Sequence, residues 1–510
     1  MSETPHRAAR LPSRALIGPG LLLLMPMVLV FHPVVRTYGF TDDYVLLWQG
    51  DTDPVFYSVG RHLSAALYHF VFSLATQVQH LVPIRLTAFA GLLASCWFLL
   101  HLLNRYGHDR WTSFFVVGCF ACSAFSTTVV AWAALFVMPW IMLLALVCGE
   151  LAVRGSEAAG SRRAVHFALS FVLGLVCLFF HQAPYTAFVV PVFLKALRTS
   201  RPSRLGFAAG VHLLTYATYF ALFRALAVLE LAPSSHRTGI QFDVLEKLLW
   251  FFQVPLPRAL AFNFVLDGRV VANLVAVVSA LVIAAFIYRR GKGRRPATRV
   301  SSAGILFVFL VFSYLPAFAV EIEPDYYVSH RTLGTLGLLI ILLFVLSIDA
   351  LVGSTRWKVG LLTAVLAIFT VNAWHNIGHG LIETQTREYL VLRDAVARIA
   401  QERGDLDELI VRSPRADFLY EDCRVMYYVE RGEKQWWAHC FEGDEYGLLS
   451  TASFWAADPF FRLVLAEAFG RAAGRIDVRI VENDAVVDDS GSSAIVDVES
   501  LFLGNERPGP

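Results

Sequence analysis

The chain has 510 residues, of which 56% are hydrophobic and only 16% are charged, and its mean hydropathy is +0.56. A soluble domain usually carries about 25% charged residues, so this composition excludes a string of soluble domains and indicates an integral membrane protein. The formal net charge of +2 gives no reason to expect a nucleic-acid partner.

Apolar stretches that could cross a bilayer follow one another as far as residue 374. A spanning helix needs about 20 mainly apolar residues. On this criterion the sequence predicts about eleven spans, of which those near 112, 165 and 183 are short. The predicted spans are 15–35, 82–103, 112–125, 131–153, 165–180, 183–197, 207–229, 270–289, 303–320, 332–351 and 359–374.

Lys and Arg are concentrated on alternate connections between these spans. The basic connections contain Arg105, Arg154, Lys195, the run 289–299 and Lys358. Short cytoplasmic loops carry an excess of such residues, so the pattern places the N-terminus in the cytoplasm. The run 289–299 also fits a nuclear signal or a nucleic-acid patch, but its place between two spans favours cytoplasmic anchoring.

This orientation divides the chain into two parts. Residues 1–377 are expected to form a polytopic α-helical membrane domain with a first outer loop at 36–81 and a late outer loop at 321–331. Residues 378–510 are expected to form a small extracytoplasmic α/β domain. This orientation places the C-terminal domain on the outer side of the membrane.

The C-terminal part has a composition of its own. Residues 387–403 carry apolar side chains at helical spacing, and "ELIVRS", "RVMYYVE" and "IDVRIVEN" have the composition of strands. Cys423 and Cys440 lie here, and an oxidising compartment would favour a disulfide between them. Five further cysteines lie in apolar runs, where a thiol usually acts as a small hydrophobic group: Cys96, Cys119, Cys122, Cys148 and Cys177.

The first outer loop opens on "FTDDY", which places Asp42 and Asp43 side by side. Two adjacent carboxylates cannot both be desolvated cheaply, and a carboxylate held near aromatic walls can act as a general base. The alternative is a solvated loop in which the pair has no role. The stretch 60–77 has a helical period and resembles a helix lying along the bilayer surface, which favours a site.

Other polar residues are expected on the same outer face. Arg85 and Arg224 lie inside predicted spans, where a functional pairing competes with simple snorkelling to the interface. The late loop "EIEPDYYVSHR" is rich in groups that recognise sugars and phosphates. His375 and His379 have metal-compatible spacing, but they lack the H-E-x-x-H pattern, and interfacial anchoring is favoured.

An inside N-terminus, one helix and an outward loop with "TDDY" resemble the GT-C superfamily of membrane glycosyltransferases. "DDY…GRHL" looks similar to bacterial transferases that use polyprenyl-phosphate sugars, including those that glucosylate O-antigen. "YYVSHRTL" before a span is similar to their late-loop region. The resemblance covers about residues 15–385 and does not extend to the tail.

The resemblance implies transfer of a sugar, with inversion, from a polyprenyl-phosphate donor to a hydroxyl of a glycan, lipid or protein. The transfer it implies is either independent of a metal or tolerates one, so the one candidate cofactor is a divalent cation with Asp43 as its ligand. The resemblance also implies the inner (plasma) membrane of a bacterium, with the C-terminal domain in the periplasm. Asp42 matches the general base and Asp43 the second acidic position. Donor phosphate binding is assigned to Arg331, His330, Arg85 and Arg224. Substrate binding is assigned to Tyr44, Arg61, His181, Glu321, Glu323, Tyr326 and Tyr327.

Two other functions fit a chain with many spans. A lipid-linked-glycan transporter or flippase would place ionisable residues at mid-membrane and show internal repeats, and the sequence shows neither. A polysaccharide polymerase or ligase also has outer loops, but it has no need of a carboxylate pair directly after the first span.

Overall fold

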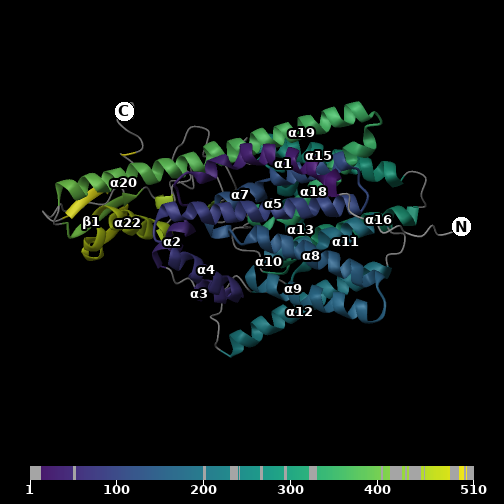
Figure 1. The fold of residues 1–510 in the computed structure, drawn as a ribbon, viewed down its shortest axis with the longest axis horizontal. Helices are drawn as coiled ribbons and strands as arrows, with labels where there is room; N and C mark the ends of the chain where they lie inside the picture. The colour runs from purple at the N-terminus through teal and green to yellow at the C-terminus, as the bar shows by residue number, and fades with distance from the viewer. Residues whose placement is uncertain are drawn as a thin grey trace.

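The computed structural model describes residues 13–49, 53–198, 203–229, 239, 242–264, 268–291, 296–320, 330–403, 406–413, 428–430, 433–435, 450–452, 454–482, 493–498 and 501. Most of these residues are helical, and the longest helices run roughly along the long axis of the molecule (Figure 1). The last helices and the strands extend beyond one end of this bundle.

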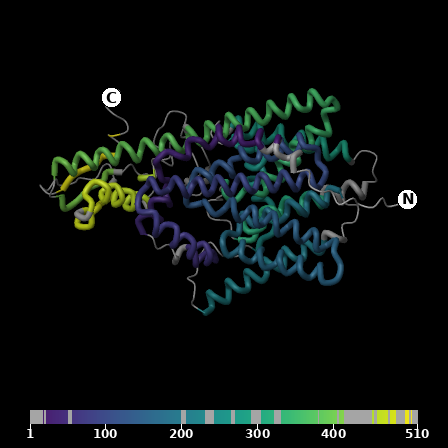
Figure 2. The backbone as a smooth tube through the Cα atoms, viewed as in Figure 1, coloured from purple at the N-terminus to yellow at the C-terminus, as the bar shows by residue number. Residues whose placement is uncertain are grey.

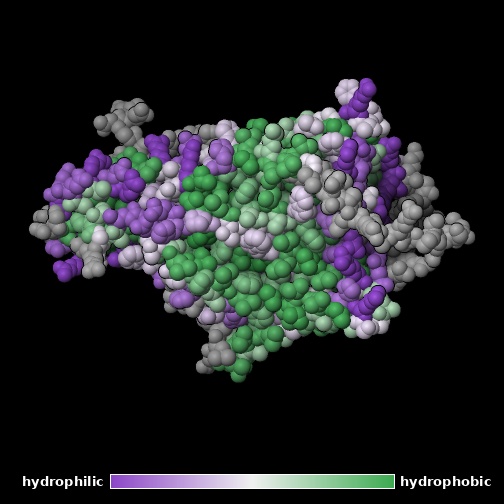
Figure 3. All heavy atoms as spheres, in the orientation of Figure 1, coloured by the Kyte–Doolittle hydropathy of each residue, from purple (hydrophilic) through white to green (hydrophobic). Residues whose placement is uncertain are grey.

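Seven helices among the described residues are long and apolar enough to cross a membrane. Each of them matches one predicted span. They include α5 (Leu81–Arg105), α8 (Met138–Glu157), α9 (Gly160–Phe180), α12 (Ser203–Val228), α15 (Gly268–Gly291), α18 (Gly334–Leu351) and α19 (Thr355–His375). The chain is therefore a helical protein with the features of a membrane protein, and Figure 3 shows a hydrophobic band between two hydrophilic ends.

The other four predicted spans are shorter or broken helices, so the expected number of eleven is not confirmed. α6 (Arg110–Ala121) and α7 (Ala124–Ala131) meet at a bend of 50° and count as an eighth span if taken together. The bend lies where the side chain of Ser123 accepts a hydrogen bond from the N–H of Ser126 and starts a new helix. The remaining elements are α1 (Ser13–Phe31), η1 (His32–Val35), α10 (Gln182–Tyr185), η4 (Thr186–Phe188), α11 (Val189–Ala196), α16 (Pro296–Phe312) and α17 (Leu315–Ala319).

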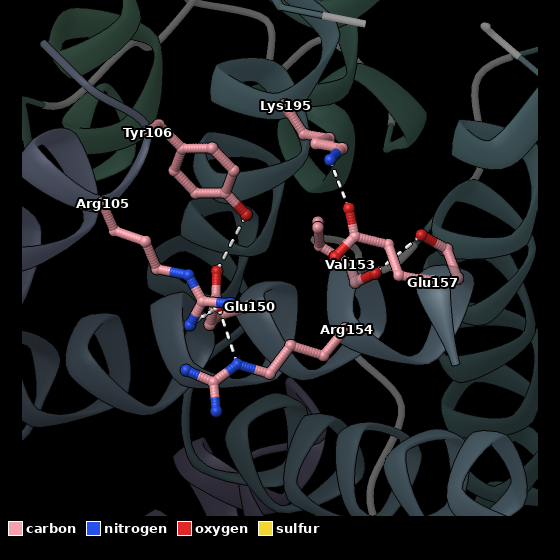
Figure 4. A network of polar contacts seen from close by, with 8 residues as sticks. Arg105, Tyr106, Glu150, Val153, Arg154, Glu157 and Lys195 are labelled. Carbon is pink, nitrogen blue, oxygen red and sulfur yellow. Dashed lines mark hydrogen bonds and ion pairs between the residues drawn. The ribbon is translucent and has the colours of Figure 1, made fainter. Parts of the chain in front are cut away.

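The basic connections of the sequence meet at one end of the bundle. Arg105 and Arg154, in the last turns of α5 and α8, pair with the buried Glu150 at 2.6 and 2.8 Å (Figure 4). Lys195 of α11 pairs with Glu157 beside them. A single buried carboxylate thus ties together the basic ends of two spans.

Later connections reach the same end. The guanidinium of Arg290 donates to the carbonyl of Leu197 at 3.0 Å, and that of Arg289 donates to the carbonyl of Leu351 at 3.3 Å. These bonds join the ends of α11, α15 and α18. The alternation of basic and non-basic connections in the sequence therefore corresponds to two opposite ends of one bundle.

Several short elements connect the long helices. They include α2 (Asp42–Gln49), α3 (Asp53–Ser58), α4 (His62–Leu74), η2 (Val78–His80), η3 (Ala133–Leu135), α13 (Val244–Gln253), α14 (Pro255–Leu260) and η6 (His330–Thr332). α4 is the helix expected at the bilayer surface. It buries Tyr68 and Phe72 on one side and exposes Leu63, Phe70 and Leu74, an arrangement that suits a helix between protein and lipid.

The bundle and the C-terminal part are joined by one unbroken helical run. α19 passes through a π-helical segment, Asn376–Glu383, into α20 (Thr384–Glu402), which the sequence predicts at 387–403. Figure 2 shows this run in green along one edge of the molecule. The expected domain boundary at 377/378 therefore lies inside a continuous helical run. His375 ends α19, and the side chain of His379 lies outside the described residues.

The C-terminal part contains a parallel sheet of three strands. β1 (Glu408–Ser413) lies between β4 (Asp477–Glu482) and β5 (Ser493–Asp497). This sheet confirms the strands predicted from "ELIVRS" and "IDVRIVEN". The remaining elements are β2 (Tyr428–Glu430), β3 (Glu433–Gln435), η8 (Ser450–Ala452), α22 (Phe454–Phe469) and η9 (Gly470–Arg475). α22 packs against both α20 and α2, next to the acidic pair.

Candidate functional site

The acidic pair begins helix α2 in the space between the bundle and the C-terminal part. Thr41, directly before Asp42, has a φ of +35°, in the left-handed region that side chains branched at Cβ rarely adopt. Asp42 is half-buried, whereas Asp43 is fully buried. The two carboxylates therefore have different surroundings.

Asp43 is held entirely by backbone groups. Its Oδ2 accepts a hydrogen bond from the N–H of Phe40 at 3.0 Å, and its Oδ1 accepts one from the N–H of Ala134 at 2.6 Å. Burial raises the pKa of Asp43 to about 7, against the lowering effects of Arg85 and of the two N–H donors. Asp43 thus joins the start of α2 to η3, and Asp42 is the more accessible member of the pair.

Arg85, predicted to bind the donor phosphate, holds the chain before α2. Its guanidinium is fully buried and donates to the carbonyls of Val34, Arg36 and Tyr38 at 3.0, 2.7 and 2.8 Å. Its Cζ lies 3.8 Å from the centroid of the Tyr38 ring. Arg85 therefore binds backbone oxygens, and it fixes the chain that leads into the acidic pair.

Arg331 is linked to the acidic pair through Trp132. The Cζ of Arg331 lies 5.3 Å from the centroid of the Trp132 ring. The same ring contacts Phe40 edge to face, with the two ring centroids 4.9 Å apart, and Phe40 lies two residues before Asp42. Arg331 and the acidic pair are almost 290 residues apart in sequence, and both contact the residues around η3.

Tyr68 of α4 shares Ala134 with Asp43. Burial raises its pKa, and the charges of four side chains also act on it: Arg61, Asp43, Asp42 and Arg331. The hydroxyl of Tyr68 donates to the carbonyl of Ala134, whose N–H donates to Asp43. Tyr68 was not predicted as a site residue, because it lies in an apolar helix whose sequence carries no functional motif.

His181 lies next to this group as a neutral imidazole. It is buried, and burial together with the charges of Arg61 and Arg331 holds its pKa well below the usual value. Its Nδ1 accepts a hydrogen bond from the N–H of Ala183 at 3.3 Å. The next residue, Gln182, accepts from Nε of Arg61 at 3.3 Å and donates to the carbonyl of Val59. Arg61 and His181, both predicted from the sequence, are therefore neighbours.

A second arginine, Arg258, lies beside His330. Burial lowers the pKa of His330 to about 3, and the charge of Arg258 contributes. A small cavity separates α7, α14 and α18 here, and its lining includes Ser123, Phe125, Arg258, Phe262, His330 and Gly334. Arg258 was missed in the sequence, where it is a lone basic residue after two prolines in an apolar stretch.

The other predicted residues are placed as follows. Tyr44 is fully buried; its hydroxyl accepts from the N–H of Gly39 at 3.1 Å, and its ring packs on Phe460 at 4.7 Å. Arg224 is exposed on α12, with its Cζ 5.2 Å from the centroid of the Phe220 ring. The remaining predictions lie outside the described residues: Glu321, Glu323, Tyr326, Tyr327, Cys423 and Cys440. All five cysteines predicted to be small hydrophobic groups are free and buried.

Neither a metal-binding group among the described residues nor a similar protein helps to assign a function to this site. Within the described ranges, no group of three or more His, Cys, Asp or Glu side chains is arranged to hold a metal ion. Comparison with models of known protein families finds no match, and comparison with characterised proteins finds none either. Any assignment of function therefore rests on the sequence and the geometry of this chain alone.

The raised pKa of Asp43 predicts how stability varies with pH. Between pH 4 and pH 7 the unfolded state ionises this group and the folded state keeps it protonated, so stability falls as pH rises through 7. From pH 6 to pH 8 the loss is about 1 kcal/mol. We expect Asp43→Asn to remove this part of the dependence in thermal unfolding. Asp394→Asn, on the exposed side of α20, is the control, and equal slopes for both variants would contradict the prediction.

Proposed function

We propose that the chain is a membrane glycosyltransferase. In this proposal it moves a sugar from a polyprenyl-phosphate donor to a hydroxyl group of a cell-envelope glycan, lipid or protein. The observation that carries the proposal is the geometry around η3. Ala134 binds Asp43 through its N–H and Tyr68 through its carbonyl. Arg331 lies over the ring of Trp132, which also contacts Phe40, two residues before Asp42. A base and fixed cations in one water-poor place are what this transfer needs.

The proposed step uses these residues in defined roles. The carboxylate of Asp42 takes the proton of the acceptor hydroxyl, and the acceptor oxygen forms a bond to the anomeric carbon of the donor. The bond from that carbon to the phosphate oxygen breaks on the opposite face, and its electron pair leaves with the polyprenyl phosphate. Arg331 stabilises the charge that grows on this phosphate, and the configuration at the anomeric carbon inverts.

Asp43 has a supporting role in this proposal. Both of its oxygens accept backbone N–H groups, so it orients the turn that carries Asp42. His181 and His330 are neutral at pH 7, so they can offer hydrogen bonds but no positive charge to a phosphate. Arg258, beside His330, is a second cation within reach of a donor bound along η6.

Transport of a lipid-linked glycan is the competing function. A transporter binds its cargo near the middle of the membrane. The charges described above lie instead in α2, in η6 and before α4, all outside the seven candidate spans. This position favours chemistry at a membrane surface.

We also propose that the basic end of the bundle faces the cytoplasm of a bacterium and that the acidic pair faces outward. Gln49 and Arg162 are exposed at the two ends. In a chain with Cys423 and Cys440 replaced by Ser, an impermeant maleimide should label Gln49→Cys in spheroplasts and Arg162→Cys only after lysis. The reverse result would place the candidate site in the cytoplasm. The five buried cysteines provide a low background.

The test of function needs no knowledge of the acceptor. The purified protein, in a lipid bilayer, is given a panel of polyprenyl-phosphate-linked hexoses and pentoses, with water and extracted glycans as acceptors. Mass spectrometry then measures the polyprenyl phosphate that is released and any new glycan. Release from at least one donor supports the proposal, and movement of intact donor across the bilayer without release would favour a flippase.

A further inference from the structure

The turn before the acidic pair is held by a residue from the far end of the chain. The N–H of Thr41 donates to Oγ of Ser450 at 2.9 Å, a contact across 409 residues of sequence. Both residues are buried. Thr41 has the left-handed φ of +35°, and such a conformation persists only where its surroundings determine it. Ser450 supplies one of those determinants.

Ser450 is itself fixed by helix α20. Its hydroxyl donates to Oε1 of Gln385 at 2.6 Å, so the oxygen's lone pairs face the N–H of Thr41. Its backbone N–H donates to Oε2 of Glu388 at 2.8 Å. The other oxygen of Glu388 accepts both the N–H and the hydroxyl of Thr451, at 2.8 and 2.6 Å. The Ser450 hydroxyl therefore has a single orientation.

The start of α2 is thus held from two sides. On the bundle side, the N–H of Ala134 donates to Asp43. On the C-terminal side, Ser450 accepts from Thr41, and the ring of Phe460 packs edge to face against Tyr44. Asp42 lies between these two attachments, and its neighbours on either side each form one of them.

We propose that Ser450 is a positioning residue that holds the Thr41 turn and thereby aims the Asp42 carboxylate at the acceptor hydroxyl. This inference rests on the proposed function. Small displacements of a catalytic group lower the rate strongly, because the reacting atoms must approach at about 3 Å in the right direction. The C-terminal part then belongs to the catalytic site although it supplies no reacting group.

The test compares three variants of the full-length protein in a bilayer. Ser450→Ala removes the acceptor for the Thr41 N–H, and Ser450→Thr keeps a hydroxyl. Tyr389→Phe is the matched control: it removes one hydrogen bond from the same helix α20, to Glu467 at 2.7 Å, that involves neither Ser450 nor Thr41. Hydrogen exchange of the peptide containing residues 38–48, the thermal midpoint and the kinetics of polyprenyl phosphate release are measured for each.

Ser450→Ala should speed exchange at Thr41 about tenfold and lower kcat about 10- to 100-fold, with KM for the donor within about twofold. Ser450→Thr should bring the exchange rate at Thr41 and kcat most of the way back to the wild-type values. Tyr389→Phe should resemble the wild type in both measurements. Unchanged exchange in Ser450→Ala overturns the contact, and faster exchange with unchanged kcat overturns the positioning role. Exchange is independent of activity, so a wild-type protein that releases no polyprenyl phosphate refutes the proposed function and leaves the contact to be decided by exchange.

Discussion

Replacing Asp42 with Asn should lower the release of polyprenyl phosphate by about 10²–10⁴-fold while the fold is retained. Asn has the same shape as Asp, but it cannot take a proton from the acceptor hydroxyl. Since Asp42 is only half-buried, the substitution removes no deeply buried charge, and the thermal midpoint should stay close to that of the wild type. KM for the donor should change little, because the donor phosphate contacts Arg331 in this proposal.

The matched variant Asp43→Asn distinguishes the role of Asp43 from that of Asp42. Its amide can accept only one of the two N–H groups that Asp43 binds, those of Phe40 and Ala134, and its NH₂ group would face the other. We expect a smaller loss of rate, about tenfold, that comes with faster hydrogen exchange in α2. A larger loss in Asp43→Asn than in Asp42→Asn would make Asp43 the base. Full activity in both variants would refute the transferase proposal.

The fold could be predicted well where one physical requirement dominates. A helix such as α15 or α18 is an unbroken run of apolar residues, and the need to span about 30 Å of hydrocarbon sets its length. A predicted span is not confirmed where the helix is interrupted within such a run. Pro184 and Pro191 lie in the stretch 183–197, which forms three short elements instead of one span.

The candidate site could be predicted in part. Asp42 follows the first predicted span and Arg331 directly precedes a later one, so the predicted topology places both on one side of the membrane. The pairing of Thr41 with Ser450 could not be foreseen, because nothing local to either residue refers to the other. The same holds for Arg85: the sequence shows a costly charge near a membrane surface, and its three carbonyl partners are visible only in the folded chain.

Arg85→Met is expected to destabilise the protein by about 3–5 kcal/mol, the cost of removing one partner from a buried charged group and its acceptors. The carbonyls of Val34, Arg36 and Tyr38 would each lose a donor that Met cannot replace. The thermal midpoint should therefore fall by about 5 °C or more. Arg224→Met is the matched control, since Arg224 is exposed on α12 and its loss should leave the midpoint nearly unchanged.

This pair also tests the phosphate role predicted for Arg85 from sequence. Added polyprenyl phosphate should raise the thermal midpoint of any variant that still binds it, by mass action. If Arg85 serves only the backbone, Arg85→Met should unfold at a lower temperature and still gain the wild-type increment from the ligand. If Arg85→Met instead unfolds at the wild-type temperature and its midpoint no longer rises when polyprenyl phosphate is added, Arg85 binds the donor phosphate. In that case the three carbonyls would need other donors, and the chain before α2 would have to be held by the remaining Tyr38 contact, in which its hydroxyl donates to the carbonyl of Ala131 at 2.7 Å.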